Sequence, residues 1–453
     1  MAVLIFDHAL LSGGWGADVR IEIADGVITQ VTPAAPRDGA EHVAGIAIPG
    51  MPNLHCHAFQ KGMAGLAERR GPAHDSFWTW REVMYRFLRV LSPDDVGAIA
   101  AYAYMEMLEA GFTAVGEFHY LHHDPDGRPY SDIAELMVRI AAAAGETGIG
   151  LTLLPSFYAQ GGFGGAPPTA GQRRFIANPE MFLRLVERAH DIAATLPARV
   201  GIAPHSLRAV TPQALRVVLD AMKTGPIHIH AAEQTQEVND CIAALGARPV
   251  EWLIANAEVD ARWCLVHATH MTEREIEALA EAGAVAGLCP LTEANLGDGI
   301  FNADQYIAAR GRFGIGSDSN IELDAAAELR QLEYNQRLRQ RARNVLALHE
   351  GESVGRRVYE DALAGGAQAL GRAIGSIKPG QRADIVVLDA DHPDLAGNSG
   401  DVWLDKYIFV AGRRLVRTVF VGGLRVVDAG AHKSRAAIAD RYRRTMARLA
   451  DNA

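Results

Sequence analysis

Residues 47–57 read AIPGMPNLHCH, a short apolar run that ends in two histidines two positions apart. Seven further apolar runs follow along the chain, and in most of them a histidine or an acid stands at the end. They are TAVGEFHY (113–120), GLTLLPSF (150–157), VGIAPHS (200–206), IHIHAAE (227–233), CLVHATH (264–270), AVAGLCP (284–290) and FGIGSDS (313–319). Short apolar runs of this kind indicate buried strands. The chain therefore has eight candidate strands.

Long helical patterns separate these runs, for example at 94–110, 131–147 and 179–195. Strands that alternate with helices indicate βαβ units and a parallel sheet. Eight such units predict the α/β class and a (β/α)8 TIM-like barrel, which we expect over residues 51–370.

Both ends of the chain are β-rich. Residues 1–50 contain two alternating runs around Asp25-Gly26, which is a strong hairpin signal. The same pattern of short apolar runs and turns occurs in SIKPGQRADIVVLDAD (376–391) and TVFVGGLRVVDAG (418–430). We expect residues 1–50 and 371–453 to meet as a small β-sandwich beside the barrel, with a helix at the C-terminus.

The composition is that of a folded enzyme, with 49% hydrophobic and 22% charged residues in 453. The net charge of -10 argues against a nucleic-acid partner, because such partners need a basic face. The N-terminus lacks the basic region of a signal peptide, and no apolar run is long enough to cross a membrane. We therefore expect a cytoplasmic protein with no membrane partner.

The four cysteines are Cys56, Cys241, Cys264 and Cys289, and none forms a CxxC pair. A disulfide framework or a structural zinc knuckle is therefore not expected. We interpret them as reduced, buried thiols.

The chemically active residues fall where the predicted strands end. Barrel enzymes build their active sites at that end of the strands, which predicts one shared site. The residues are His55, His57, Glu117, His119, His205, His230, Glu233, His267, His270, Glu293, Asn295 and Asp318.

A metal site is the best interpretation of this pattern. His55 and His57 lie on one face of a strand and can chelate a cation. His228 and His230 form a second pair, of which one member is structural if the site holds one ion. Asp318 can bind a metal and accept a proton, although an Asp at a strand end is equally often a helix cap.

PGMPNLHCH (49–57) and GSDSN (316–320) resemble the first-strand and eighth-strand signatures of the amidohydrolase superfamily, and SIKPGQRADIVVLD resembles its C-terminal segment. The resemblance implies that one divalent cation, zinc, is bound by His55, His57, His230 and Asp318, with His267 close to it.

A second, bridging cation is not expected. A binuclear centre of this superfamily uses a carboxylated lysine, and no lysine lies at the end of the third or fourth strand. The HxxE spacing of His230 and Glu233 instead resembles the mononuclear deaminase branch. That resemblance implies catalytic roles for Glu233 as proton shuttle, for Asp318 as acceptor of the water proton and for His267, which orients the attacking oxygen.

Further segments are similar to one group of this branch, whose members release ammonia from a linear amidine with two carboxylates. A small-molecule dicarboxylate needs cationic and hydrogen-bonding groups in the pocket. Arg81 and Arg208 are the candidates for carboxylate binding, and Gln60, Tyr120 and His205 are candidates for hydrogen bonds to substrate. The segments are NLHCHAFQKGMAGL, DSFWTWREVMYR, EFHYLHHD, HSLRAVTP, HIHAAEQ, LVHATH and LTEANLGDGIF.

Two alternatives remain open on the sequence. One is a related deaminase that acts on a purine or pyrimidine ring, and the other is a metal-binding protein without catalysis. A homodimer is implied by the resemblance. Asn320, His119, His122 and His123 receive no role.

Overall fold

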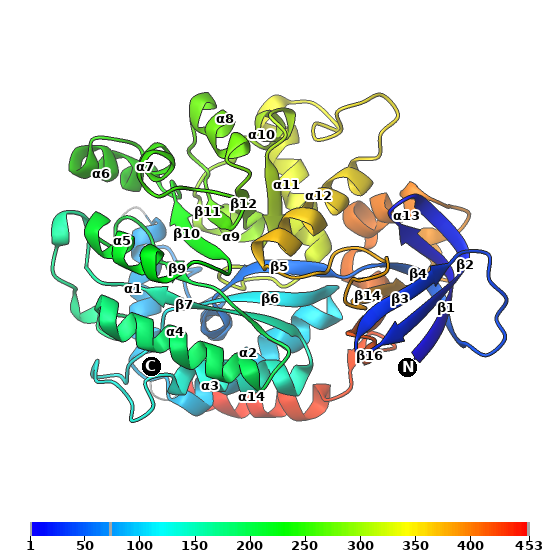
Figure 1. Cartoon of the computed structure of the whole chain (residues 1–453), viewed down its shortest axis with the longest axis horizontal. Coiled ribbons are helices and arrows are strands. Elements are labelled where there is room, and N and C mark those ends of the chain that lie inside the picture. Colours follow the sequence, from blue (N-terminus) through cyan, green and yellow to red (C-terminus); the bar gives the residue numbers. More distant parts are fainter. Residues whose placement is uncertain (1, 72–74, 451–453) are drawn as a thin grey trace.

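The computed structural model describes residues 2–71 and 75–450, and the eight predicted strands form a parallel barrel (Figure 1). The strands make two hydrogen-bonded arcs. The first arc contains β5 (Met51–Cys56), β6 (Phe112–His119), β7 (Gly150–Phe157), β8 (Arg199–Val200) and β9 (Ala203–Pro204). The second contains β10 (Ile227–Ala231), β11 (Trp263–His267), β12 (Val285–Leu288) and β13 (Arg312–Ile315).

Isolated parallel bridges join the two arcs. Ile202 pairs with Ile227 and Ser206 with His230 at one seam, and Cys56 pairs with Asp318 at the other. The barrel is therefore closed, and the predicted fold class is confirmed.

The fourth predicted strand is interrupted, which the sequence did not indicate. The Gly201 amide donates to the Leu153 carbonyl in β7, whereas the next amide, Ile202, donates to Pro226 on the opposite side. Regular pairing with β7 covers only residues 199–200 and 203–204, and Pro204 has no amide proton to donate, so 200–206 contains the short strands β8 and β9.

Helices follow most strands and cover the outside of the barrel (Figure 1). The helix predicted at 131–147 begins at Glu135, because Asp132 accepts a hydrogen bond from the Ala134 amide in a preceding turn. The helices are α1 (Phe77–Leu88), α2 (Pro93–Glu109), α3 (Glu135–Thr147), α4 (Pro179–Ala194), α5 (Pro212–Ala221), α6 (Thr235–Leu245), α7 (Pro249–Asn256), α8 (Glu273–Glu281), α9 (Pro290–Leu296), α10 (Ala303–Ala308), α11 (Ala325–Gln340), α12 (Val354–Ala369), α13 (Asp401–Lys406) and α14 (Arg435–Ala450). Short 3-10 or π turns occupy Ala58–Met63, Phe163–Gly165, Ala170–Gln172, Pro393–Leu395, Tyr407–Ala411 and Gly412–Leu415.

Helix α12 closes the base of the barrel, opposite the ends that carry the polar residues. It approaches so closely that a Cβ atom at Gly365 would lie 1.9 Å from the Phe313 carbonyl oxygen. Inside, Leu54 fills the space left by Gly287 and Gly314, where added Cβ atoms would lie 2.9 and 2.5 Å from its methyl groups. The base is therefore apolar and tightly packed.

The two chain ends form one continuous sheet of eight strands in the order β17-β16-β15-β14-β4-β1-β2-β3. Asp25 and Gly26 both have positive φ, so the predicted hairpin is confirmed. The strands are β1 (Ala2–Leu11), β2 (Gly14–Ala24), β3 (Val27–Thr32), β4 (Glu41–Pro49), β14 (Ile385–Leu388), β15 (Val416–Val421), β16 (Leu424–Asp428) and β17 (Ala431–His432).

This sheet curls over its own core instead of stacking as two separate layers. In a flat sheet, Phe6 in β1 and Phe420 in β15 would be about 14 Å apart, since three inter-strand steps separate them. Their rings are 6.2 Å apart and meet edge to face. The expected sandwich is thus one curled sheet, to which both chain ends contribute.

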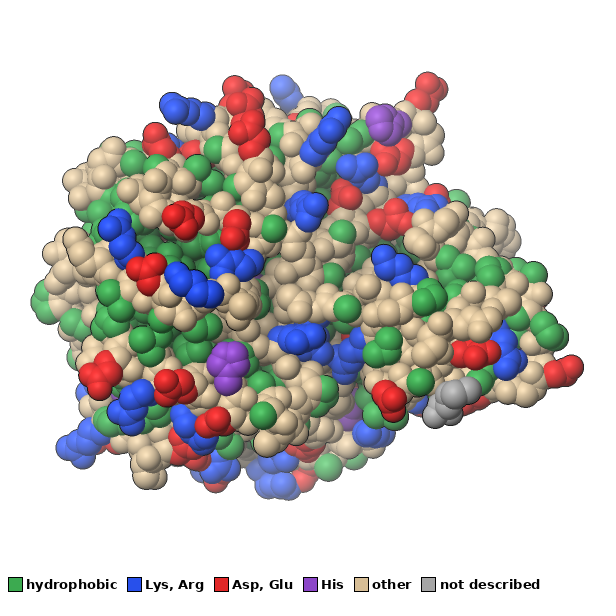
Figure 2. Space-filling view, viewed as in Figure 1, with side chains coloured by type: hydrophobic (Ala, Val, Ile, Leu, Met, Phe, Trp, Pro, Cys, Tyr) green, Lys and Arg blue, Asp and Glu red, His purple; other side chains and the backbone are tan. Residues whose placement is uncertain are grey.

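Charged side chains of both signs are scattered over the face shown in Figure 2. All four cysteines are free and buried, as predicted. Among the described residues, no helix combines the length and apolar character needed to cross a bilayer.

Candidate metal centre and substrate pocket

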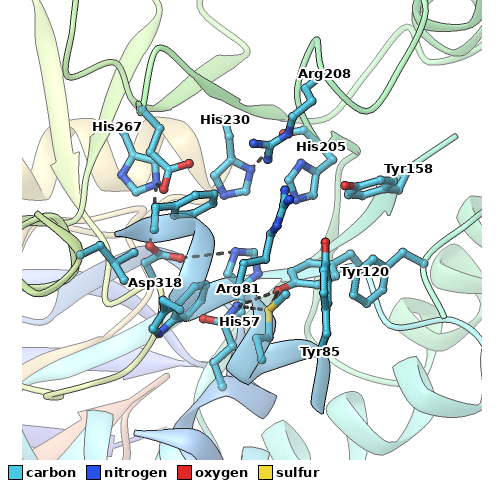
Figure 3. A pocket seen from close by; sticks show the side chains of 17 residues that line it. His57, Arg81, Tyr85, Tyr120, Tyr158, His205, Arg208, His230, His267 and Asp318 are labelled. Carbon is cyan, nitrogen blue, oxygen red and sulfur yellow. Dashed lines mark hydrogen bonds and ion pairs between the residues drawn. The ribbon is translucent and has the colours of Figure 1, made fainter. Parts of the chain in front are cut away.

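Four buried side chains meet at the C-terminal end of the barrel, and three of them, His57, His230 and Asp318, are labelled in Figure 3. His55 lies in β5, His57 directly after it, His230 in β10 and Asp318 after β13. One ligand atom from each lies within 4.8 Å of the others. The Nε2 atoms of His55 and His57 are both 3.3 Å from Asp318 Oδ1, and the Nε2 atoms of His55 and His230 are 3.2 Å apart.

The histidines are oriented as metal ligands. His57 Nδ1 donates to the Phe118 carbonyl at 2.8 Å, and His230 Nδ1 donates to the His205 carbonyl at 2.9 Å. These bonds leave the Nε2 lone pairs directed at the cluster. Burial lowers the pKa of His55, His57 and His230, which keeps the rings in the neutral form that binds metal. Three imidazoles and one carboxylate fit a divalent cation.

Backbone bonds across the seam fix the first and last ligands relative to each other. The His57 amide donates to the Asp318 carbonyl, and the Asp318 amide donates to the His55 carbonyl, both at 3.0 Å. Asn320 Nδ2 donates to the His57 carbonyl at 2.9 Å, while Asn320 Oδ1 accepts from Ser317 Oγ at 2.6 Å. Asn320, for which no role was expected, therefore holds the loop that carries Asp318.

Several residues around the cluster have left-handed backbone conformations. Ala232, His267, Ala268, Asp318 and Asn320 have φ between 44° and 67°. For residues other than glycine this conformation is uncommon, and it costs about 1–3 kcal/mol where it is strained. Such concentration at the strand ends is typical of a functional site.

The expected proton-transfer residues lie beside the cluster. His267 Nε2 is 3.8 Å from Glu233 Oε1 and 3.8 Å from Asp318 Oδ2, and its Nδ1 contacts Glu293 Oε1 at 3.2 Å. Burial raises the pKa of Glu233 to about 7. A carboxyl group with this pKa can carry a proton at neutral pH and deliver it. Glu237 accepts from the Glu233 amide at 2.9 Å and so fixes its backbone.

A pocket opens directly over the cluster, and all of the predicted substrate-binding residues line it (Figure 3). Gln60 Nε2 donates to the Tyr120 hydroxyl at 2.7 Å, so these two side chains form one hydrogen-bonded unit. The His205 ring centroid is 4.8 Å from that of His230, so His205 lies directly beside this candidate metal ligand.

The guanidinium groups of Arg81 and Arg208 stack on aromatic rings. The Cζ atom of Arg81 is 4.6 Å from the Trp78 ring centroid, and that of Arg208 is 5.4 Å from it. Within residues 2–71 and 75–450, no carboxylate forms an ion pair with either arginine, and both Nε atoms are buried without a hydrogen-bond partner. Trp78 thus positions two cations, a contact that its sequence context did not indicate.

The other histidines contact the backbone away from the pocket. His228 Nε2 donates to the Ala369 carbonyl at 2.8 Å, which makes it the structural member of its pair. His122 and His123 likewise donate to the carbonyls of Ser156 and Ile176. His119 is buried and does not line the pocket.

Comparison with known proteins shows which family and which relatives the chain resembles. Residues 46–426 match the Amidohydrolase family, and residues 1–44 match the N-terminal domain of formimidoylglutamate deiminase HutF. The formimidoylglutamate deiminase of Pseudomonas aeruginosa is 54% identical over 95% of this chain and 96% of that protein. A 5-methylthioadenosine/S-adenosylhomocysteine deaminase of Natronomonas pharaonis is 30% identical over 93% of this chain and 92% of that protein.

Solved structures share the fold. An amidohydrolase from Brucella melitensis superposes with a TM-score of 0.95 at 51% identity and covers 99% of this chain and 100% of its own. An adenosine deaminase from Xanthomonas campestris with bound zinc has a TM-score of 0.81 at 23% identity, over 99% of this chain and 98% of its own. At that identity the second match shows the fold alone.

Proposed function

This chain belongs to the amidohydrolase family, within its formimidoylglutamate deiminase group, and we propose that it hydrolyses N-formimino-L-glutamate to N-formyl-L-glutamate and ammonia. It is a hydrolase that acts on carbon–nitrogen bonds. The choice of substrate rests on Arg81 and Arg208, which line the pocket over the candidate metal centre.

The substrate has two carboxylates and one amidine, and the pocket offers a matching set of groups. Arg81 and Arg208 are cations without an acidic partner among the described residues, and their stacking on Trp78 leaves the planar edges free for carboxylate oxygens. Leaving two such cations in a pocket is unfavourable unless anions bind there. A neutral purine or pyrimidine would leave both charges unmatched.

We assign the metal to zinc, held by His55, His57, His230 and Asp318, one ion per chain. When bound, the cation supplies the positive charge that makes a water molecule nucleophilic near neutral pH. The donor set of three imidazoles and one carboxylate supports this assignment.

The side chains of this protein carry the proton transfers. Asp318 accepts the proton of the attacking water, and His267, held by Glu293, orients the water oxygen toward the formimino carbon. Glu233 protonates the formimino nitrogen as its double bond to carbon breaks, so the carbon bears both the new hydroxyl and an amino group. Glu233 then takes up the hydroxyl proton as the carbonyl of the formamide forms. The proton held by Asp318 passes to the amino group, which leaves as ammonia when the carbon–nitrogen bond breaks.

Binding of the two ends of the substrate positions the amidine over this cluster. Arg81 and Arg208 hold the carboxylates, and the Gln60–Tyr120 unit and His205 complete the hydrogen bonds. We also propose that the enzyme is a cytoplasmic homodimer that acts in histidine degradation.

The test is ammonia release by the purified, zinc-loaded protein. N-formimino-L-glutamate should be hydrolysed, whereas adenosine, guanine, cytosine and 5-methylthioadenosine should release no ammonia above background. N-formimino-glycine, which has one carboxylate, serves as the matched control and should react with a lower kcat/KM. Release from ring substrates alone would contradict the proposal and favour a ring deaminase. Release from none would favour a binding protein.

A further inference from the structure

A second group of ligand-type side chains lies beside the proposed metal centre. His267, Cys289 and Asp318 each offer one ligand atom, and these three atoms lie within 4.8 Å of one another. Their exposed fractions are 1%, 0% and 6%. Asp318 belongs to both groups, and Cys289 has no part in the proposed reaction.

The barrel brings these residues together because they end three consecutive strands. His267 ends β11, Cys289 follows β12 and Asp318 follows β13, and the three strands are paired in parallel. Glu293 adds a common anchor, since its Oε1 accepts from the Cys289 amide at 2.8 Å and contacts His267 Nδ1 at 3.2 Å.

The donor set differs in kind from that of the first group. It contains a thiol sulfur, and thiolates favour soft cations such as zinc and cadmium over magnesium or calcium. Around a tetrahedral cation with bonds of about 2.0–2.3 Å, ligand atoms are about 3.5 Å apart. Atoms that all lie within 4.8 Å of one another reach that arrangement by small side-chain movements.

We propose that His267, Cys289 and Asp318 form a second, weaker site for a thiophilic divalent cation, and that its occupation inhibits the enzyme. The occupants are zinc in excess of one equivalent, or cadmium. The inference rests on the proposed metal centre, because the two sites share Asp318.

Binding and inhibition follow from the same contacts. The S–H bond of Cys289 breaks, a sulfur–metal bond forms and the proton leaves to solvent, with no change of oxidation state. Repulsion between two cations around one carboxylate makes the second site the weaker one. A cation held there occupies His267 and Asp318, the residues assigned to orient and deprotonate the water.

A cobalt titration of the metal-free, full-length protein reads the two sites separately. The first equivalent, bound through nitrogen and oxygen, should give no thiolate-to-cobalt charge-transfer band. Further cobalt should produce that band in the near ultraviolet. In Cys289→Ala the band and the second equivalent should be lost while the first is retained. Cys264→Ala is the matched control, because Cys264 is buried in the same apolar cluster but belongs to neither ligand group.

Inhibition gives an independent readout. The uninhibited rate of each variant is its rate with one zinc per chain. The cadmium concentration that halves this rate should rise at least about tenfold in Cys289→Ala and stay unchanged in Cys264→Ala. Cys289→Ser, which preserves the volume, provides a second variant if the alanine protein does not fold. The absence of a thiolate band in the wild type, or a band that survives without Cys289, would overturn the proposal. Failure of the first equivalent to bind would contradict the metal centre instead.

Discussion

We expect Arg81 and Arg208 to contribute to substrate binding more than to the chemical step. Arg81→Met removes one of the two guanidinium groups that face the pocket. A hydrogen bond to a charged group contributes about 1.5–3 kcal/mol, so kcat/KM should fall by about 10- to 100-fold, mainly through a higher KM. Steady-state kinetics with N-formimino-L-glutamate measure the change, and the same loss is expected for Arg208→Met.

The control for Arg81 lies on the same helix. Arg86 in α1 is exposed and is not part of the pocket, so Arg86→Met should leave KM unchanged. Equal KM values for Arg81→Met and the wild type would show that Arg81 does not bind the substrate.

We expect Glu233 to contribute to the chemical step more than to substrate binding. Glu233→Gln keeps the size of the side chain but removes its proton-transfer capacity, so kcat should fall by about 100- to 10,000-fold. Elemental analysis should still find one zinc per chain, because Glu233 is outside the ligand group. Loss of zinc together with activity would mean that the residue acts through the metal.

At the residue scale, the sequence predicted which residues form the site better than it predicted the contacts that hold them in place. The four candidate ligands lie together because each comes at or just after a strand end, which a linear pattern reveals, whereas Arg81 comes from α1. Asn320 and Trp78 were missed because the His57 carbonyl and the Arg208 guanidinium, which they contact, are distant from them in sequence. Only the fold brings such contacts together.

Helix α12 offers a test at the scale of an element. Gly365→Ala would place a methyl group 1.9 Å from the Phe313 carbonyl, so helix and barrel must separate. We expect a loss of at least about 3 kcal/mol in the free energy of unfolding, the upper end for overpacking. Denaturant unfolding followed by circular dichroism measures it.

Gly145 in α3 is the matched control. A methyl group there meets only Leu196 Cδ2, at 3.6 Å, which is ordinary contact. Gly145→Ala should therefore stabilise the protein by up to about 1 kcal/mol, because alanine is the better helix former. Similar losses for both variants would contradict the close approach of α12.

The elements themselves were predictable where periodicity alone decides them. The helices expected at 94–110 and 179–195 are α2 and α4, to within one residue at each end. The division of the fourth strand into β8 and β9 was not predicted, because it depends on pairing with the neighbouring strands and not on hydrophobic periodicity. The curl of the terminal sheet likewise depends on packing between strands that are remote in sequence.

Removal of the metal should destabilise the whole molecule. Ligands come from both arcs of the barrel, so a bound cation favours the closed state over the unfolded chain. Free zinc at about one hundred times its dissociation constant adds about 2.7 kcal/mol of stability. Chelation should lower Tm measurably in the wild type, and calorimetry should detect no such effect in Asp318→Ala.

The division of the barrel into two arcs has a consequence for how the protein matures. His55 and His57 belong to the first arc, and His230 and Asp318 to the second, so neither half contains a complete ligand set. During synthesis the last ligand leaves the ribosome long after the first pair. With the proposed ligand set, we expect insertion of the metal to wait for the eighth strand, and a chain that ends before Asp318 to form no complete site.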